Sequence, residues 1–490
     1  MPTAVIAGGS VAGLASALAL SGIGYRVLVL ERAPSPPQWS GADPGSGWRR
    51  PTAPQGLQSH TLTSLGVRVL RERAPRLLAA ARAAGAPVLD LTRALPADAA
   101  DSAPEPGDAE LVALGCRRST LELLLHRTVG DTPGVTLRHD TTVVALELHR
   151  GHRGVAAVVT GTGERVPADI VVDATGRRAL SRRWLHDAGI PVTADRTSAS
   201  GLVGHTRFYR LRGRTLPGPL NRGHGVGDVY DHYAGVLHPG DDGTFSIALG
   251  SLPGDRVLQA ALRTRTGFTA AARATPGLAP WLADGVSSPI SPVRVISSPP
   301  NTLRGAAGPQ QFPVPGLFQV GDAACITNPL FGRGMSLALD HAFRLADLLA
   351  ERPDIDAAQR LAVARMTHEL FLPWYEQAAG ADRLRSARWQ AAVDGRPAVP
   401  VPPGELPTGE LPTGELPTGA EIAAAARTDG TVWRGLTRML MTLCTPAELF
   451  ADDKFLARVR QAAPAGPAPT PPPGRDELLR LVTATEGTRA

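Results

Sequence analysis

The sequence contains almost no lysine, and its basic residues form no cluster. Of 51 lysine and arginine residues, Lys454 is the only lysine, and the arginines are scattered along all 490 residues. The net charge of +6 therefore does not indicate a nucleic-acid partner, which would require a basic patch or block.

Cysteines are few, and long apolar runs are absent. Cys116, Cys325 and Cys444 lie far apart, which argues against a disulfide framework and favours a cytoplasmic protein. Residues 11–20 are apolar, but a strand-like segment rather than a basic one precedes them, so they do not resemble a signal peptide. We expect no membrane span, and the twelve histidines lack metal-ligand spacing, so we expect no metal site.

The order of strand and helix signals predicts an α/β fold with an inserted domain. Signals alternate over residues 1–195, as is typical of a parallel sheet with crossover helices. Residues 196–300 instead show the patterns and turns of an antiparallel sheet, and the strand-then-helix pattern returns over 301–352. We therefore predict a Rossmann-type domain in two parts, with an antiparallel β-sheet substrate domain between them.

The C-terminal third is predicted to be helical over residues 353–462. Within it we expect a Pro/Gly-rich loop at 396–419, where Gly-Glu-Leu-Pro-Thr occurs three times. Residues 431–461 have apolar residues at near-helical spacing, which predicts an amphipathic helix packed on the body. We expect residues 463–490 to form a Pro-rich tail.

A glycine-rich turn follows the first predicted strand. The turn contains Gly8, Gly9, Ser10 and Gly13, with Ser10 where the usual pattern has a glycine. Gly8 permits the tight turn and Gly13 allows close packing of helix on strand. The N-terminus of the following helix offers N–H groups to a diphosphate, so the turn predicts a dinucleotide site.

The second predicted strand ends at Glu31, which Arg32 follows. An acidic side chain about 20 residues beyond the glycine turn hydrogen-bonds ribose hydroxyls and repels a 2′-phosphate. The two segments together predict FAD or NAD rather than NADP.

A later segment favours FAD over NAD. A predicted strand ends just before Asp322, which would accept hydrogen bonds from the ribitol hydroxyls of a flavin. The helix that begins near Gly334 would direct its N–H groups at the N1/O2 edge of the ring, where negative charge appears on reduction. The residues expected to border the ring are Pro329, Gly332, Gly334 and Met335.

These motifs resemble those of the FAD-dependent aromatic hydroxylases, most closely the bacterial polyether- and squalene-epoxidase-like branch. The resemblance covers about residues 1–350 and implies a GR2-like FAD-binding domain. Residues 54–60 are similar to a Pro-Gln loop with histidines beside the flavin, and Arg118 matches an arginine that contacts the FAD diphosphate or ribose. His60 is then either a general base or a side chain packed beside the ring.

The resemblance implies a monooxygenase. In that reaction FAD is reduced, O2 is captured as a C4a-hydroperoxyflavin, and one oxygen atom enters an apolar, natural-product-like substrate by hydroxylation or epoxidation. Residues 173–177 depart from the family's Asp-Gly motif, which contacts FAD and NAD(P)H, because Thr175 replaces an aspartate. Two electron sources therefore stay open: NAD(P)H used directly, or a partner flavin reductase.

Other flavin chemistries share the same cofactor site. Flavin halogenases resemble one another in a Trp-x-Trp-x-Ile-Pro motif and an active-site lysine, neither of which this sequence provides. A flavin-dependent dehydrogenase or reductase acting on a prenyl or polyketide-type substrate needs the same geometry and is the alternative. A non-catalytic flavin-binding regulator would be expected to lose the glycines at 332 and 334, which are both present.

One face of the inserted sheet carries polar residues that alternate along a predicted strand. His205, Arg207 and Tyr209 either face the flavin and hold a polar group of the substrate, or form a solvated face. Of these we expect Arg207 to be the substrate-contacting residue.

Overall fold

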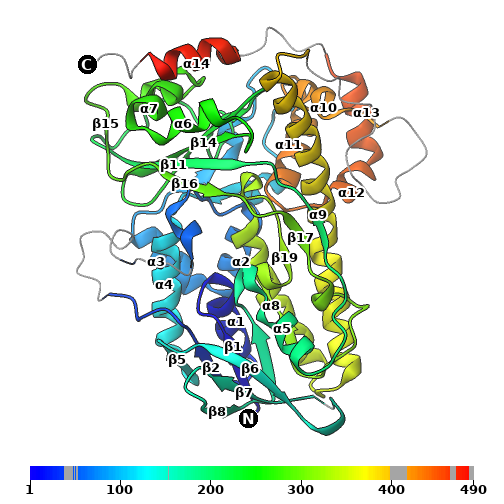
Figure 1. Cartoon of the computed structure of the whole chain (residues 1–490). Helices are drawn as coiled ribbons and strands as arrows, with labels where there is room; N and C mark the ends of the chain where they lie inside the picture. Colours follow the sequence, from blue (N-terminus) through cyan, green and yellow to red (C-terminus); the bar gives the residue numbers. More distant parts are fainter. Residues whose placement is uncertain are drawn as a thin grey trace.

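The structure is a computed structural model. It describes residues 1–37, 48, 50, 53–152, 154–397, 416–463 and 471–484. Most of the loop expected at 396–419, and residues 464–470 and 485–490 of the tail expected at 463–490, lie outside these residues. Two halves stand one above the other, with the chain starting at the lower end and finishing at the top (Figure 1).

The lower half is built on a five-stranded parallel sheet. Its strand order is β18-β9-β1-β2-β5, and every neighbouring pair is parallel. Both faces are buried: Ala4 and Ile6 of β1 point into one core, and Val5 and Ala7 into another. The sheet's strands are β1 (Thr3–Ala7), β2 (Arg26–Leu30), β5 (Val135–Arg138), β9 (Ile170–Asp173) and β18 (Leu317–Gln319).

Helices cover one face of this sheet and an antiparallel meander covers the other. α1 packs against α4 and α8, because its small side chains allow close approach. These helices are α1 (Val11–Gly22), α4 (Arg118–Gly130) and α8 (Gly334–Glu351). The other face is covered by β6 (Val143–Leu148), β7 (Val155–Thr160), β8 (Arg165–Pro167) and α5 (Leu180–Asp187). The predicted Rossmann-type fold is confirmed.

The upper half contains an antiparallel sheet that lies in the sequence between β9 and β18. Its order is β12-β13-β14-β11-β15, with β16 also paired to β11. The turn at Asp241-Asp242-Gly243 joins β13 to β14, as the sequence predicts. The strands are β11 (Val203–Leu211), β12 (Val226–Val229), β13 (Ala234–Pro239), β14 (Thr244–Ser251), β15 (Ser287–Pro289) and β16 (Arg294–Ser297).

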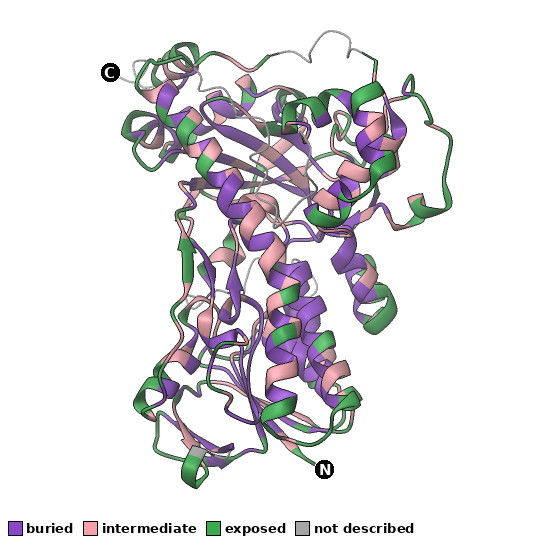
Figure 2. Ribbon diagram, turned by 90° about the vertical axis from the view of Figure 1, so that its right-hand side faces the viewer, coloured by how far each residue is buried: buried purple, intermediate pink, exposed green. Residues whose placement is uncertain are grey.

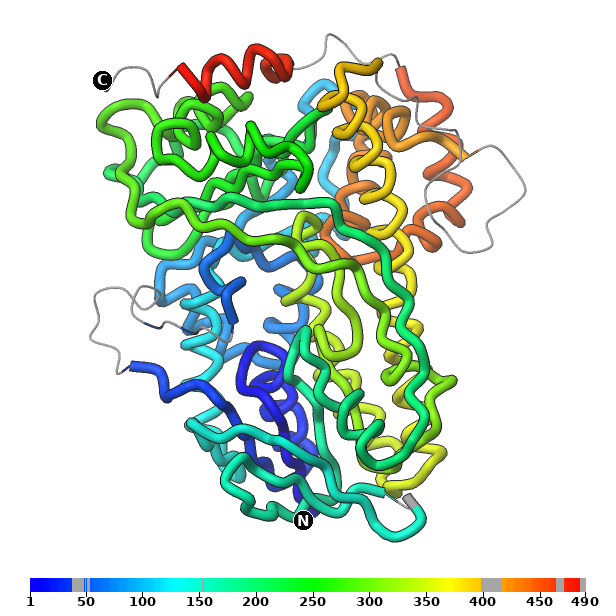
Figure 3. The backbone as a smooth tube through the Cα atoms, in the orientation of Figure 1, coloured from blue at the N-terminus to red at the C-terminus, as the bar shows by residue number. Residues whose placement is uncertain are grey.

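The chain passes into the upper half and back through two adjacent segments (Figure 3). β10 (Arg196–Ser198) pairs antiparallel with β17 (Asn301–Leu303), which also pairs with β19 (Cys325–Ile326). The long helix α9 (Ala357–Val393) then runs beside both halves over roughly 55 Å, at 1.5 Å per residue. Near its start Arg360 donates to the carbonyl oxygen of Ala306 at 3.0 Å, and near its end the Trp389 indole donates to that of Tyr230 at 2.8 Å. α9 therefore ties the two halves together.

The expected helical stretch at 431–461 is three helices rather than one. Thr442, at φ +66°, and the Thr445-Pro446 start of α12 interrupt the pattern. Arg434 of α11 holds the group to the body, with its Nε 2.7 Å from Asp108 and an Nη donating to the Asp101 carbonyl at 2.8 Å. The three helices are α11 (Gly430–Leu440), α12 (Pro446–Phe450) and α13 (Asp453–Gln461), and α10 (Gly419–Ala425) precedes them.

The expected Pro-rich tail contains a helix. α14 (Arg475–Thr483) buries Leu478 and Val482 completely against α6 (Arg256–Arg263) and α7 (Arg265–Ala274), and Arg475 pairs with Asp255 at 2.9 Å. The proline- and alanine-rich composition before residue 475 led us to predict a tail instead of this helix.

Of the remaining elements, one helix packs against α8 and one against α4 (Figure 1), and two short strands pair with each other. They are α2 (Ser64–Arg73), α3 (Pro75–Ala83), β3 (Val88–Asp90) and β4 (Val112–Leu114). Buried residues run through the strands of both halves, while exposed ones gather on the outer helices and loops (Figure 2). Within the described ranges, every helix is too short or too polar to span a membrane.

Candidate functional site

A cavity of about 640 Å³ lies where the two halves meet. Gly8 and Ser10 border it from the turn after β1, and Asp322, Gly332 and Gly334 border it from a segment about 300 residues later. Two motifs far apart in the sequence therefore face one space, whose size is typical of a ligand pocket (about 300–1,000 Å³).

The glycine turn has the geometry that its sequence predicts. Gly8 has φ +108°, and a Cβ there would lie 2.5 Å from the carbonyl oxygen of Ala174. A Cβ on Gly13 would lie only 1.8 Å from the carbonyl oxygen of Gly8. Because the side chain of Ser10 does not cap α1, the helix N-terminus is left for a ligand at the cavity.

Glu31 stands at the end of β2, buried and held in place at the cavity wall. It accepts hydrogen bonds from the main-chain N–H of Gly9 and of Ala33, both at 2.7 Å, and pairs with Arg50 at 2.9 Å. Gly9 thus supports the carboxylate and does not itself line the cavity. Arg32 lines the same end of the cavity.

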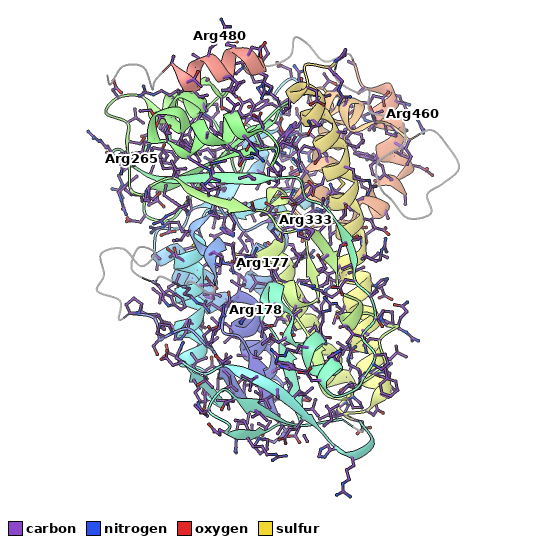
Figure 4. The ribbon with its side chains drawn as sticks, in the orientation of Figure 1. Arg177, Arg178, Arg265, Arg333, Arg460 and Arg480 are labelled. Carbon is purple, nitrogen blue, oxygen red and sulfur yellow. The ribbon has the colours of Figure 1, made fainter. Side chains whose placement is uncertain are left out.

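Three more arginines line the lower cavity, and one of them, Arg118, pairs with the buried Glu122 at 3.5 Å. Arg118 begins α4 and donates to the hydroxyl of Ser10 at 3.2 Å. Arg177 and Arg178 follow β9 and lie in the middle of the molecule (Figure 4); in the described chain, neither is within 4 Å of a carboxylate. Burial, and then the charge of Arg32, lower the pKa of Arg178. Crowded guanidinium groups of this kind suit a diphosphate.

The segment after β18 presents a carboxylate and a second uncapped helix. Burial raises the pKa of Asp322, and the charges of Arg118 and Arg177 oppose that shift. α8 begins at Gly334 without a side-chain cap, and a Cβ added to Gly334 would meet nothing within 4 Å. Pro329 and Met335 also line the cavity. The residues predicted to surround a flavin ring therefore border one open space.

Arg333 lies between the two glycines and is 4% exposed. Its guanidinium stacks between Phe331 at 4.7 Å and Trp374 at 4.6 Å, and donates to the side chain of Gln377 at 2.6 Å. Burial lowers its pKa to about 9, so the group is a cation at neutral pH.

His60 lines the cavity, as expected, and is neutral. Its Nδ1 lies 2.9 Å from the carbonyl oxygen of Gln58. Burial, and then the charge of Arg118, lower its pKa to about 4. A histidine with this pKa is a weak base, which favours the packing role over the general-base role.

The upper wall of the cavity is one face of the antiparallel sheet. Most of its side chains are small, which leaves room for a ligand; His238 of β13 and, from the segment before β12, Arg222 and His224 also line the cavity here. The small residues that line this wall are Gly204, Thr206, Ala234, Val236, Ala248 and Gly250.

The expectation for Arg207 is wrong, because it lies on the opposite face of the sheet. It pairs in register with Ile247, which is buried among residues of α6 and α7. Its guanidinium donates to the carbonyl oxygen of Ser291 at 3.2 Å and to the hydroxyl of Thr269 at 3.3 Å. Side chains alternate between faces, so His205 and Tyr209 also point away from the cavity. The sequence signal for the cavity face was the pair of small side chains at Gly204 and Thr206 in the first half of β11.

The end of α11 closes the cavity from the C-terminal region, where Leu440 and Met441 line it. The main-chain N–H of Leu65 donates to the carbonyl oxygen of Met441 at 3.2 Å. Lys454, by contrast, is exposed on α13 and does not border the cavity.

No known protein-family profile and no curated protein sequence matches this chain. Solved structures do. A probable FAD-dependent monooxygenase, PqsL from Pseudomonas aeruginosa, is similar over 80% of this chain and 99% of its own, at 18% identity and a TM-score of 0.55. The flavin-dependent brominase Bmp2 is similar over 94% of this chain and 98% of its own, at 15% identity and a TM-score of 0.57.

A third similar structure is the flavin-dependent halogenase CmlS, at 19% identity and a TM-score of 0.55. The similarity covers 81% of this chain and 66% of CmlS. At these identities the comparisons show a shared fold, that of FAD-dependent monooxygenases and flavin-dependent halogenases.

Proposed function

We propose that this protein is an FAD-dependent monooxygenase that inserts one oxygen atom from O2 into a largely apolar small molecule. The observation that carries the proposal is the convergence of the glycine turn, Asp322 and the Gly332–Gly334 segment on one cavity. That cavity continues onto a sheet face with small side chains, which provides room for a substrate beside the cofactor.

The residues present fit FAD. The uncapped N-terminus of α1, with Arg118, Arg177 and Arg178 beside it, would hold the diphosphate, and Glu31 the ribose hydroxyls. Asp322 would accept hydrogen bonds from the ribitol chain, and the open backbone at Gly334 would leave space for the ring. Bound FAD would supply the activation of O2, while the protein orients the substrate and keeps water out.

The proposed reaction type rests on the shared fold and on the space beside the sheet wall, above the proposed cofactor site, which leaves room for a substrate. One neighbour, PqsL, has been solved in complex with 2-aminobenzoylacetate, so a protein of this fold binds a small organic molecule. The loop over residues 54–60 borders the cavity, which supports the epoxidase-like assignment. NAD(P)H or a partner reductase would supply electrons, and the free thiols of Cys116, Cys325 and Cys444 suit the cytoplasm.

The first experiment is a titration of the purified protein with FAD. We expect one FAD per chain and a yellow protein whose reduced flavin is reoxidised by O2. The second uses 18O2: a product carrying one 18O atom supports the monooxygenase. A protein that binds no FAD would refute the proposal, and turnover without 18O in the product would favour the dehydrogenase or reductase.

A further inference from the structure

Two histidines that line the cavity have their tautomers fixed by main-chain carbonyls. The Nδ1 of His224 lies 2.9 Å from the carbonyl oxygen of Arg222, and the Nδ1 of His60 lies 2.9 Å from that of Gln58. A carbonyl oxygen only accepts hydrogen bonds, so each Nδ1 carries the hydrogen. A neutral imidazole has one N–H, which leaves the Nε2 of each ring as an acceptor.

Both rings are neutral at physiological pH. Burial, and then the charge of His238, lower the pKa of His224 to about 3; burial and Arg118 lower that of His60 to about 4. Among the described residues no hydrogen-bond partner contacts either Nε2, and neither nitrogen is sealed within protein. Both rings line the cavity, so it presents two unpaired acceptors.

A third histidine and two serines join these rings into one group. The ring of His238 stacks on that of His224 with centroids 5.6 Å apart, and its Nδ1 lies 3.1 Å from the hydroxyl of Ser59. That hydroxyl is 2.8 Å from the hydroxyl of Ser246. Ser59 directly precedes His60, so the loop at 54–60 and the antiparallel sheet meet here. We call His60, His224, His238 and Ser59 the histidine cluster.

Two arginines act on the histidine cluster, Arg118 on His60 and Arg222 on His224 and His238, and the wall around the cluster is otherwise largely apolar. Leu202, Val229 and Ile296 line the same cavity, as do the small residues of the sheet wall. Arg222, which pairs with the exposed Asp228 at 3.6 Å, also lines it and lowers the pKa of both His224 and His238. A positive charge at this point keeps the rings neutral and favours an oxygen atom that bears negative character.

We propose that the histidine cluster binds a hydroxyl group of the substrate, with the substrate O–H donating to the Nε2 of His224 or of His60. The rest of the substrate is apolar, to match the wall. Arg222 selects acidic hydroxyls, phenolic or enolic, over plain alcohols, because it stabilises charge on their oxygen. This inference rests on the proposed function, since it assigns the substrate of the same cavity.

The test uses FAD-loaded protein and three probes of similar shape: 1-naphthol, 1-methoxynaphthalene and naphthalene. Only the naphthol donates a hydrogen bond, and one such bond is worth about 0.5–1.5 kcal/mol. We expect 1-naphthol to bind up to about tenfold more tightly than the other two, measured by calorimetry or by perturbation of the flavin spectrum.

Variants then locate the acceptor. If the Nε2 of His224 is the acceptor, His224→Leu should remove most of the preference for 1-naphthol while leaving the affinity for 1-methoxynaphthalene within about twofold. If the Nε2 of His60 is the acceptor, His60→Leu should have this effect instead. His224→Gln should restore part of the preference, because its amide oxygen can occupy the place of Nε2. His186→Leu is the matched control, because that histidine is exposed on α5.

Equal binding of the three probes would overturn the inference, as would a His224→Leu/His60→Leu variant that retains the full preference for 1-naphthol. An equal loss of affinity for all probes in His224→Leu would indicate a role in shape alone and would also overturn it. FAD occupancy, read from the absorbance of the same samples, tests the proposed function separately: an empty protein refutes that function, while a loaded protein without discrimination refutes only the inference.

Discussion

Gly13→Ala tests whether the glycine turn holds a diphosphate. The new Cβ would lie 1.8 Å from the carbonyl oxygen of Gly8, whereas real Cβ contacts stay beyond 3.0 Å. The turn and α1 must therefore separate by more than an ångström. Overpacking of this kind costs about 1–3 kcal/mol of stability.

The same displacement should weaken FAD binding. Losing one hydrogen bond from a main-chain N–H to a charged phosphate costs about 1.5–3 kcal/mol, which is roughly a 10-fold to 100-fold loss of affinity. Ultrafiltration or quenching of flavin fluorescence measures the dissociation constant, and chemical denaturation measures the stability of the FAD-free protein.

Gly22→Ala is the control, because it lies in the same helix and its Cβ would meet nothing within 4 Å. It should bind FAD normally and gain up to about 0.5–1 kcal/mol in helix stability. If Gly13→Ala binds FAD as tightly as the unmodified protein and is equally stable, the turn does not form the cofactor site as described.

Three further predictions concern other parts of the molecule. Gly334→Ala should leave the FAD-free protein as stable as before, since its Cβ would contact nothing, yet weaken FAD binding at least about tenfold by occupying the ring's space; equal binding in a titration would contradict this. Arg117→Met should cost about 3–5 kcal/mol in denaturant unfolding, because it removes the guanidinium paired at 2.5 Å with the fully buried Asp241, and adding Asp241→Asn should recover part of the loss. Burial lowers the pKa of His341 to about 3, so the ring is neutral in the folded protein. Its contribution to stability is therefore complete above the unfolded pKa of about 6.5 and is lost as the pH falls toward 3, with a slope of up to about 1.4 kcal/mol per pH unit. His341→Leu should flatten the pH dependence of the unfolding free energy between pH 6 and 4, and an unchanged slope would count against this reasoning.

Local patterns in the sequence were sufficient to predict the parallel sheet and the segments that border the lower part of the cavity, the proposed cofactor site. Three short sequence features reflect what the backbone or a ligand needs at that point. They are the strand that ends before Gly8, the acidic residue at the end of β2 and the glycines around Arg333. Such requirements act over a few residues, so they can be recognised without knowing what lies opposite.

The substrate side depended on tertiary structure. Whether Thr206 or Arg207 faces the cavity is set by which face of β11 the helices α6 and α7 cover, and both faces carry polar residues in the sequence. The pairing of Ser59 with His238 joins residues 179 positions apart, which no spacing rule predicts. α14 was likewise hidden, since its apolar face is short and is stabilised only by docking on α6 and α7.

The amino-acid sequence by itself thus determined the nucleotide-binding fold and the residues expected at the cofactor, because short-range backbone geometry dictates them. Only the folded chain decided which side chains line the upper wall of the cavity, where we propose that the substrate binds, because sheet orientation and contacts between distant segments result from burying the whole apolar surface at once.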